Sequence, residues 1–295
     1  MNSLMKGKVI VITGATSGIG QIAAEKLAAM GARIIQVARD RARGEAAMKR
    51  LHDAAPSLAH GIYYADLSRI ADTKRVAVEI AAAEPRIDVL VNNAGAIFST
   101  REVTEEGLER TFALNHMSYF VLTHFLLDRL VTSAPARIVN TSSDAHRSAQ
   151  LAFDDLQSAH AYKGSFFALV RYGGLGYSVY ARSKLCNILF TRALAKRLKG
   201  TGVTVNSFHP GFVATRFADQ AGGLIALGTK IAKRFARPVE KGAETLVFLA
   251  SAPDVQDTTG QYFHDCQIAP VSSTALDDTV AERLWLESRR LSGLE

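Results

Sequence analysis

The sequence predicts a single α/β domain in which helices cover both faces of a doubly wound, mainly parallel sheet of seven strands. Three observations support this fold. Apolar, strand-like runs alternate with stretches of helical periodicity, a glycine-rich turn directly follows the first run, and polar side chains follow several later runs. The chain has 295 residues, is 48% hydrophobic and contains no low-complexity segment, so one core is expected to span residues 1–295.

The predicted strands and helices alternate through most of the chain. Short runs rich in β-branched and apolar residues are expected to form strands at 8–13, 33–38, 60–65, 88–92, 136–141, 203–208 and 261–264. Amphipathic stretches are expected to form helices near 18–30, 41–54, 69–83, 104–133, 179–199 and 239–251. The region 104–133 is long enough for two helices.

Three segments interrupt this alternation. We predict a loop insertion at about 144–178, a substrate-side helical segment at about 218–238 and a C-terminal extension at about 267–295. Two interpretations of the insertion are equally supported, an apolar lid over the substrate and a contact between subunits. Both would depend on its aromatic side chains, which are Phe166, Phe167 and Tyr172.

The charge pattern favours a small anionic ligand over nucleic acid. The formal net charge of +7 is spread along the chain, except for a basic stretch at 230–241. This stretch is interpreted as a solvated helix face, with peripheral contact to a membrane surface as the alternative. The chain shows no secretory start and no apolar run long enough to cross a membrane, so a cytoplasmic protein is expected.

The cysteines and histidines predict neither a disulfide framework nor a metal site. Cys186 and Cys266 are the two cysteines, and neither belongs to a CxxC pair. Both are expected to be ordinary core thiols. The eight histidines are scattered, without the spacing of metal ligands.

A glycine-rich turn follows the first predicted strand and precedes the first predicted helix. Its sequence is Thr13-Gly14-Ala15-Thr16-Ser17-Gly18-Ile19-Gly20. Glycines allow a tight turn and a close approach of backbone N–H groups to a phosphate at the helix N-terminus. The turn therefore predicts a dinucleotide site, and a purely structural turn is the alternative.

Arg39 stands just after the second predicted strand, where the adenosine ribose of a dinucleotide is expected. An acidic residue at this strand end would accept hydrogen bonds from the ribose hydroxyls, but Ala38 occupies the position and a cation follows it. A guanidinium suits a 2′-phosphate, so NADP(H) is favoured and NAD(H) is the alternative. Arg39 can also be interpreted as a solvated residue at a helix start, beside Asp40.

Polar residues end two further strands at the edge where open α/β sheets bind ligands. The fourth strand runs into Asn92-Asn93-Ala94-Gly95, which can form a turn, approach a ligand, or do both. The fifth strand runs into Ser142-Ser143, where a hydroxyl can bind a substrate oxygen. A loop start or helix cap is the alternative interpretation of the serines.

Tyr180 and Lys184 are one helical turn apart, so their side chains are expected on one face with Cβ atoms roughly 5–6 Å apart. A nearby ammonium lowers the pKa of a phenol, and Tyr180 is therefore expected to move protons near working pH. Such a pair is often a surface contact. Its presence in a chain with a dinucleotide turn and a strand-end serine favours carbonyl reduction.

Taken together, these residues resemble the short-chain dehydrogenase/reductase family over residues 7–264. The matching motifs are Thr13-Gly14-x-x-x-Gly18-x-Gly20, Asp66-Leu67, Asn92-Asn93-Ala94-Gly95, Asn115, Ser143, Tyr180-x-x-x-Lys184 and Pro210-Gly211. Longer stretches are similar to the retinol dehydrogenase and protochlorophyllide reductase-like branch. They include Asn115-His116, Phe153-Asp154-Asp155-Leu156, Ser183–Phe190, His209-Pro210-Gly211 and Leu284-Trp285. The segment 164–176 is longer than this branch leads us to expect.

The resemblance implies a Rossmann-like fold and roles for particular residues. The implied catalytic residues are Tyr180 as general acid or base, Lys184 as the residue that lowers the pKa of Tyr180 and holds the nicotinamide ribose, Ser143 as the residue that steadies the carbonyl oxygen, and Asn115 as the residue that positions a water. The implied cofactor-binding residues are Gly14, Thr16, Ser17, Gly18, Ile19, Gly20, Arg39, Asp66, Leu67, Asn93, Ala94, Gly95, Tyr180, Lys184, Pro210, Gly211, Val213 and Thr215. No metal is implied.

The implied function is that of an NADP(H)-preferring oxidoreductase that interconverts a hydrophobic aldehyde or ketone and its alcohol by hydride transfer. The alternatives are an NAD-dependent alcohol dehydrogenase and a non-catalytic NADP(H)-binding sensor. The partners expected are a small-molecule carbonyl or alcohol substrate and further copies of the chain. A homodimer or homotetramer is implied, with subunit contacts through the helices near 104–133 and 179–199.

Overall fold

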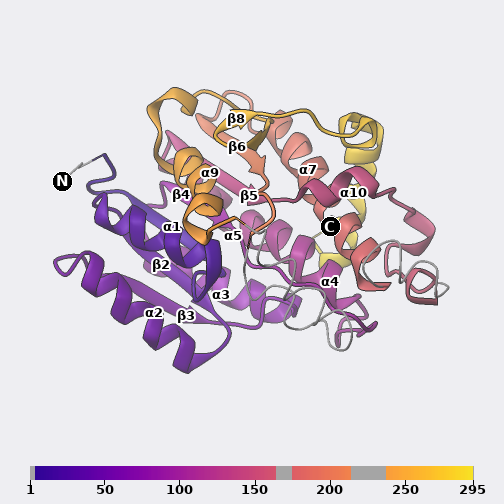
Figure 1. Ribbon diagram of the computed structural model, residues 1–295, viewed down its shortest axis with the longest axis horizontal. Coiled ribbons are helices and arrows are strands. Elements are labelled where there is room, and N and C mark those ends of the chain that lie inside the picture. Colours follow the sequence, from indigo (N-terminus) through magenta and orange to yellow (C-terminus); the bar gives the residue numbers. More distant parts are fainter. Residues whose placement is uncertain (1–3, 164–174, 214–236, 295) are drawn as a thin grey trace.

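The computed structural model describes residues 4–163, 175–213 and 237–294, which form an eight-stranded sheet with helices on both faces (Figure 1). The strand order is β3-β2-β1-β4-β5-β6-β7-β8. The strands are β1 (Val9–Thr13), β2 (Arg33–Ala38), β3 (Gly61–Tyr64), β4 (Val89–Asn92), β5 (Ala136–Thr141), β6 (Val203–Phe208), β7 (Tyr262–His264) and β8 (Gln267–Ile268). The first seven are parallel, as predicted, and they bring their carboxyl ends to one edge.

The eighth strand was not expected. β8 pairs antiparallel with β7, through a turn in which Asp265 and Cys266 have positive φ angles of 48° and 62°. Its two residues, Gln267 and Ile268, are exposed. Such a short, exposed strand carries no run of apolar residues or alternation, so the sequence pattern contained no signal for it.

The predicted helices form two layers (Figure 1). One layer, packed on one core, contains α1 (Gly18–Ala29), α2 (Arg41–Ala54) and α9 (Val239–Ser251). The opposite layer, packed on a second and larger core, contains α3 (Ile70–Ala83), α5 (Ser118–Thr132) and α7 (Leu175–Arg197). The two cores lie on opposite faces of the sheet, and this agrees with near-continuous apolar strands.

The helical region predicted at 104–133 begins later and is less regular than expected. It consists of a short helix, α4 (Arg110–Phe112), a π-helical turn at Ala113–Met117, and then α5. Glu109 caps the start, because its carboxylate accepts hydrogen bonds from the amides of Thr111 and Phe112 at 2.9 and 2.7 Å. A π-helical turn has no distinct hydrophobic period over five residues, so the sequence predicted only continuous helix.

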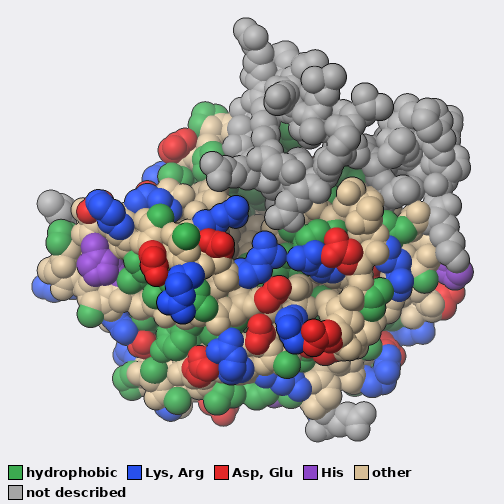
Figure 2. Space-filling model, turned by 90° about the horizontal axis from the view of Figure 1, so that it is seen from below, with side chains coloured by type: hydrophobic (Ala, Val, Ile, Leu, Met, Phe, Trp, Pro, Cys, Tyr) green, Lys and Arg blue, Asp and Glu red, His purple; other side chains and the backbone are tan. Residues whose placement is uncertain are grey.

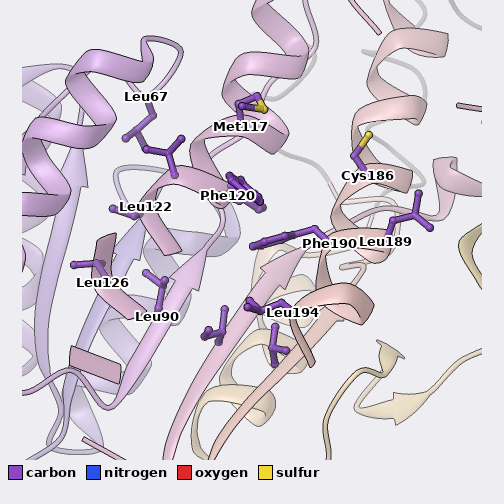
Figure 3. Close-up of a cluster of buried hydrophobic side chains, with 14 of the residues drawn as sticks. Leu67, Leu90, Met117, Phe120, Leu122, Leu126, Cys186, Leu189, Phe190 and Leu194 are labelled. Atoms are coloured by element: carbon purple, nitrogen blue, oxygen red, sulfur yellow. The ribbon is translucent and has the colours of Figure 1, made fainter. Parts of the chain in front are cut away.

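The larger core lies between the sheet and the layer of α3, α5 and α7, and Figure 3 shows part of it. Phe120 and Phe190 come from α5 and α7, and their ring centroids are 5.7 Å apart. Asn92 was predicted to form part of a turn, but it is fully buried in β4. Its amide donates to Asn140 Oδ1 on β5 and to Thr123 Oγ1 on α5, at 2.9 and 3.0 Å. These bonds tie the helix layer to the strands.

The residues predicted as a C-terminal extension include a long helix, α10 (Asp278–Ser292), which packs beside α7 (Figure 1). Trp285 of α10 stacks on Phe190 at 6.0 Å and meets Phe120 edge-on at 5.0 Å. The guanidinium of Arg197 lies 4.0 Å from the indole centroid, and Arg197 also pairs with Glu282 at 2.7 Å. α10 therefore covers the sides of α5 and α7 on which Phe120 and Phe190 lie.

The two cysteines lie in different environments. Cys186 is fully buried, as predicted, and burial raises the pKa of its thiol to about 12. The prediction for Cys266 was wrong, because this residue lies partly exposed in the turn between β7 and β8. The backbone amide of Cys266 donates a hydrogen bond to the hydroxyl of Thr245, on α9, at 3.1 Å.

Charge is mixed on the molecular face shown in Figure 2, where Lys and Arg side chains alternate with Asp and Glu. The basic stretch predicted at 230–241 lies largely outside the described residues, as do Phe166, Phe167 and Tyr172. Within the described ranges, no helix has the length and hydropathy required to span a bilayer.

We predict that Trp285→Ala lowers the free energy of unfolding by about 2–3 kcal/mol, because it removes the contacts of the indole with Phe120, Phe190 and Arg197. The matched control is Leu286→Ala, the next residue of α10, whose side chain is 55% exposed. Urea unfolding would measure both variants. Equal, small losses would contradict the packing described for α10.

Candidate active site

The glycine turn joins β1 to α1 in the predicted place and leaves the start of α1 without a side-chain cap. Gly14 and Gly18 have φ angles of +68° and +60°, which side chains other than glycine rarely adopt. Ser17 is the N-cap residue, but its side chain caps no amide, and the first turn of α1 contains no acidic residue. Backbone N–H groups at such a helix start are suited to bind an anion.

Asn93 locks this turn against the end of β4. Its side-chain amide donates to the carbonyl oxygens of Thr13 and Gly14 at 3.0 and 3.2 Å. A Cβ atom on Gly14 would lie 2.8 Å from the Cα of Ala94, and one on Gly20 would lie 2.4 Å from the Asn93 amide nitrogen. The glycines are therefore required by close packing, and the Asn93 amide is used to shape the turn.

Thr13 is a residue of this turn that the sequence analysis left without a role. Its hydroxyl oxygen accepts hydrogen bonds from the backbone amides of Asn93 and Ala94 at 2.9 and 3.0 Å. Thr13 precedes the first glycine and ends β1, so its place at a ligand-binding edge was the available signal. The hydroxyl joins the carboxyl ends of β1 and β4.

Arg39 and Asp66 follow the ends of the neighbouring strands β2 and β3. The register pairs Ala38 with Tyr64, and the amide of Ala65 donates to the carbonyl of Ala38 at 3.0 Å. Arg39 is exposed and makes no ion pair with the described residues. Its neighbour Asp40 is directed to its own helix, since it accepts from the Arg43 amide at 2.8 Å. A cation at this strand end therefore remains available to an anionic ligand.

Asp66 and Leu67 lie in the loop after β3. One carboxylate oxygen of Asp66 accepts from the amide and the hydroxyl of Ser68, at 3.0 and 2.7 Å, which fixes the orientation of the side chain. Leu67 is buried in the larger core and is labelled in Figure 3. The loop therefore presents Asp66 beside the ends of β2 and β3 while Leu67 anchors it.

Tyr180 and Ser143 meet at the carboxyl end of β5. Tyr180 is 9% exposed on α7, and the side chain of Ser143 lies close enough to its hydroxyl to lower the pKa of that hydroxyl. The Ser143 oxygen also accepts from the amide of Ala145 at 3.2 Å, which holds it at the start of a 3-10 turn. The neighbouring Ser142 has a different task, because its buried hydroxyl donates to the carbonyl of Lys184 at 2.7 Å.

Lys184 is almost fully buried, with 2% exposure, and its ammonium donates to the carbonyl oxygen of Thr141 at 3.1 Å. The nitrogen lies 5.6 Å from the ring centroid of Tyr180 and 5.7 Å from that of Tyr119. A Cβ atom on Gly95 would lie 3.3 Å from it. Burial lowers the pKa of Lys184 to about 7, because the charged form loses solvation.

Our expectation for the pKa of Tyr180 was wrong in direction. Burial raises the pKa above its ordinary value, because the phenolate would be poorly solvated, and the nearby Ser143 side chain lowers the pKa by less than burial raises it. The same burial shifts Lys184 toward its neutral form, so it supplies less positive charge than an exposed lysine would. Sequence spacing predicted the neighbour correctly but contained no measure of burial.

Asn115 lies in the π-helical turn and is fully buried. Its side chain bonds the backbone of Ala96 twice, accepting from the amide at 2.9 Å and donating to the carbonyl at 3.0 Å. It also donates to the hydroxyl of Ser183, next to Lys184, at 3.0 Å. Asn115 thus joins the loop after β4 to α7. Its backbone carbonyl accepts from the Asn187 amide at 2.9 Å.

The residues predicted beyond β6 are partly described. Gly211 has a φ of +78°, and its amide donates to Nδ1 of His209 at 3.2 Å. Val213 and Ile19 approach one another at Gly242, where a Cβ atom would lie 2.6 and 3.0 Å from their methyl groups. The Pro210-Gly211 segment therefore returns to the start of α1. Thr215 lies outside the described residues.

The described site fits a nicotinamide dinucleotide. It offers a helix start with no side-chain cap, next to close-packed glycines, and a cation, Arg39, after β2. It also offers the phenol of Tyr180 near Lys184, both on α7 beside the end of β5. All these features lie at one edge because the strands are parallel. Among residues 4–163, 175–213 and 237–294, no group of three or more potential ligands is placed to hold a metal ion.

The model of the short chain dehydrogenase family matches residues 8–161 and 164–223. The chain belongs to this family. As a short-chain dehydrogenase, it is an NAD(P)-dependent oxidoreductase that acts on CH–OH groups. Its Rossmann-like fold and its nicotinamide dinucleotide cofactor agree with the sequence predictions.

Relatives and solved structures support this assignment. The chain is 40% identical to retinol dehydrogenase 14 of Mus musculus over an alignment of 304 positions, gaps included, which covers 99% of the chain and 87% of the relative. It is 38% identical to retinol dehydrogenase 12 of Homo sapiens, over 99% of the chain and 89% of the relative. The crystal structure of an uncharacterised protein from Mycobacterium paratuberculosis is similar with a TM-score of 0.74 and 28% identity, covering 98% and 94% of the two chains.

A further similar structure is that of Pseudomonas aeruginosa RhlG in an active-site complex with NADP. It superimposes with a TM-score of 0.68 at 28% identity and covers 89% of this chain and 96% of the other.

Two buried residues of this short-chain dehydrogenase escaped the sequence analysis. Tyr119 of α5 lies beside Lys184, and Asn187 stands three residues after Lys184 on α7. Asn187 donates to the carbonyl of Thr141 at 3.0 Å, which is also the acceptor for Lys184. Helical spacing was an available signal for Asn187, since residues three apart share a face. Tyr119 is indistinguishable from a core aromatic by pattern alone.

We predict that Gly14→Ala abolishes dinucleotide binding and lowers the free energy of unfolding by roughly 3 kcal/mol, because the new methyl group meets Ala94 while φ is positive. Gly7→Ala is the matched control. Gly7 has a similar φ of +75°, but its Cβ position is in open space, so only about 1 kcal/mol is expected. Urea unfolding and fluorescence titration with NADPH measure the two effects, and equal losses would contradict the close packing at Gly14.

Proposed function

We propose that this short-chain dehydrogenase uses NADPH to reduce a hydrophobic aldehyde or ketone to its alcohol. The observation that supports this reaction is the arrangement after β5. The Tyr180 hydroxyl meets Ser143, and the Thr141 carbonyl two residues before Ser143 holds Lys184. A proton donor and a second polar group can therefore converge on one substrate oxygen.

The chemistry proposed for the residues follows from their surroundings. A bound nicotinamide dinucleotide supplies the hydride to the carbonyl carbon. Ser143 donates a hydrogen bond to the carbonyl oxygen as negative charge develops on it, and the Tyr180 hydroxyl gives that oxygen its proton. Because burial raises the pKa of Tyr180, its protonated form predominates at neutral pH, and this favours its action as an acid in the reductive direction.

Lys184 is proposed to restore the proton that Tyr180 gives up. Its pKa of about 7 means that both its ammonium and its amine forms are accessible near neutral pH. Asn115 is proposed, from the family resemblance alone, to position a water next in this path; its side chain bonds Ala96 and Ser183. Lys184 is also proposed to bind the nicotinamide ribose, in keeping with the resemblance.

We favour NADP(H) over NAD(H) because Arg39 is exposed after β2 and has no carboxylate partner among the described residues. A guanidinium binds a phosphate with charge-assisted, often bidentate hydrogen bonds. The NADP complex of the similar RhlG structure supports the same choice. The other cofactor-binding residues predicted from the resemblance are proposed to contact the phosphates and the ribose of the same ligand.

A bulky, apolar substrate is supported by the names of the relatives, which are retinol dehydrogenases. Beside the site, Phe212 is 62% exposed directly after Gly211. An exposed phenylalanine next to a polar catalytic edge can contribute to an apolar binding surface. We therefore propose an isoprenoid or similarly extended aldehyde as the substrate class, with retinaldehyde as the first compound to test.

The assembly and location remain predictions from the sequence. A homodimer or homotetramer is implied by resemblance, through the helices now described as α5 and α7. Since α10 covers Phe120 and Phe190 of these helices, a subunit contact on that side would have to include α10. A cytoplasmic location is likewise proposed from the sequence.

We predict that Tyr180→Phe lowers kcat/KM for carbonyl reduction by roughly 10²- to 10⁴-fold, because it removes the proton donor and leaves the ring in place. Purified protein would be mixed with NADPH or NADH and with retinaldehyde, medium-chain aldehydes and aromatic ketones, and nicotinamide absorbance would be followed. Tyr63→Phe, which removes a hydroxyl on β3, is the control and should retain activity.

Three outcomes of this assay are distinguishable. NADPH oxidation that is lost in Tyr180→Phe supports the reductase. Turnover only with NADH supports an NAD-dependent alcohol dehydrogenase. NADPH binding without turnover on any carbonyl would favour the cofactor-sensing alternative, and undiminished activity of Tyr180→Phe would remove this residue from the mechanism.

We predict that Arg39→Ala raises the Kd for NADPH by roughly 10- to 100-fold and leaves the Kd for NADH almost unchanged, because a charge-assisted bond to the 2′-phosphate is lost. Lys49→Ala, which removes an exposed cation from α2, the helix that follows Arg39, is the control for net charge. Fluorescence titration measures both ligands. Equal losses for NADPH and NADH would show that Arg39 does not select the cofactor.

A further inference from the structure

His146 is a fully buried titratable residue to which the proposed reaction assigns no role. It stands three residues after Ser143, in the 3-10 turn Asp144–Ser148 that follows β5. Its Nδ1 atom lies 2.8 Å from the carbonyl oxygen of Ser143, and its Nε2 atom lies 3.2 Å from the backbone nitrogen of Ser272. The ring also meets that of Tyr262 edge-on, with centroids 5.1 Å apart. His146 therefore connects the candidate catalytic serine to the C-terminal extension.

The two hydrogen-bond partners fix the tautomer of His146. The carbonyl oxygen of Ser143 can only accept, so Nδ1 carries the proton and donates it. The backbone amide of Ser272 can only donate, so Nε2 is unprotonated and accepts. A proton on Nε2 would place two N–H groups against each other at a buried position, which is costly. Burial also lowers the pKa of His146 below its ordinary value, so the neutral form predominates at neutral pH.

Ser143 is held by its own turn and by this imidazole. Its carbonyl oxygen also accepts from the backbone amide of His146 at 3.2 Å, and its hydroxyl oxygen accepts from the amide of Ala145 at 3.2 Å. A displacement of His146 would therefore disturb both bonds to the carbonyl and, with them, the orientation of the hydroxyl. A catalytic group must be held within roughly 0.5 Å of its productive position, so this support bears directly on the proposed reaction.

The C-terminal extension supplies a fixed partner on the other side of the ring. Directly after β8, the amide of Ala269 donates to the carbonyl of Tyr262, on β7, at 2.8 Å. Ala275 is fully buried in the larger core. The guanidinium of Arg147 donates to the carbonyl of Pro270, which gives the 3-10 turn a second bond to the same segment. The segment is attached to the sheet and to the core, so it can hold the turn in place.

The charged and titratable groups near His146 leave its form to the two hydrogen bonds. Asp144 and Arg147, in the same turn, form an ion pair at 2.6 Å, and their effects on the pKa of His146 are opposite in sign. On the side of the sheet, the ring faces Tyr262, on which His209 stacks with centroids 5.7 Å apart. Within the described part of the chain, no carboxylate is bonded to the imidazole.

We propose that His146 is a positioning residue through which the C-terminal extension holds the catalytic Ser143. This inference rests on the proposed reductase function, in which Ser143 donates to the carbonyl oxygen of the substrate. The buried imidazole bonds the Ser272 amide and the Ser143 carbonyl at once, so the position of the first determines that of the second. The extension thus contributes to the reaction through the backbone of Ser143.

The first test compares two substitutions of His146 that separate hydrogen bonding from packing. His146→Phe keeps a ring beside Tyr262 and removes both nitrogens, whereas His146→Asn loses the ring and keeps an N–H group near the position of Nδ1. We expect His146→Phe to lower kcat by about tenfold and to leave the Kd for NADPH almost unchanged, because the bond to Ser143 is lost. We expect His146→Asn to lower kcat by no more than about threefold.

Urea unfolding of both His146 variants shows whether their activities follow their stabilities. Losses of kcat in proportion to the losses of stability would overturn the proposal, and so would a smaller loss of kcat in His146→Phe than in His146→Asn. A rise in the Kd for NADPH that accounts for the lost activity would also overturn it, because the effect would then lie in cofactor binding.

A second pair of variants tests the bond from Ser272. Ser272→Pro removes the backbone N–H, and the φ of −67° at this residue already suits proline. Ser272→Ala is the matched control, because it keeps the N–H and removes a buried hydroxyl that has no hydrogen-bond partner among the described residues. Only Ser272→Pro is expected to lower kcat, by roughly three- to tenfold. Equal effects of the two substitutions would contradict the role of the amide.

A third measurement needs no turnover. In ¹⁵N NMR of the histidines of the wild-type chain, the His146 signals, identified by their loss in His146→Phe, should show the neutral form protonated at Nδ1. The form protonated at Nε2, or titration at or above the ordinary histidine pKa of about 6.5, would overturn the proposal. In Ser272→Pro, the pKa of His146 should rise, because Nε2 no longer accepts a hydrogen bond. A chain that shows the expected tautomer but oxidises no NADPH with any carbonyl would refute the proposed function and confirm the connection from Ser272 to Ser143.

Discussion

The carbonyl oxygen of Thr141, at the end of β5, is the acceptor to which the candidate active site is attached. Lys184 and Asn187, one turn apart on α7, both donate to it, at 3.1 and 3.0 Å. The next residue, Ser142, bonds the backbone of α7 in return. A central strand of a parallel sheet is held on both sides, so β5 supplies a rigid support for this helix. The relative positions of Ser143 and Tyr180 follow from that attachment.

Close packing has a similar role at the dinucleotide turn. Gly14 and Gly20 lie against Asn93 and Ala94 with no space for a methyl group, and hydrogen bonds that Asn93 donates to Thr13 hold the two loops together. Contacts within the protein therefore fix the conformation of the turn, and the same contacts fix the helix start that faces the ligand. Rigid support of this kind is the usual requirement for a preorganised site.

The sequence predicted most of the fold because its strongest signals are local. All seven parallel strands lie where apolar runs were found, and the glycine turn and the Tyr180–Lys184 spacing brought the expected residues to one edge. What depends on tertiary surroundings was not predictable in this way. The raised pKa of Tyr180 reflects burial, and Cys266 lies in a turn. Asn92 is buried and joins β4 to β5 and α5 by hydrogen bonds. β8 was too short to leave a pattern.

The π-helical turn at Ala113–Met117 has a consequence for the register of the chain. A turn of this type contains one more residue than an α-helical turn, and the amide of Ser118 closes it by bonding the carbonyl of Ala113. In a regular helix each residue advances the direction of its side chain by about 100°. Loss of a single residue here would rotate Asn115 and everything before it away from α7, even though every amino acid type were retained. Chain length within this turn is therefore as much a part of the site as the identity of its residues.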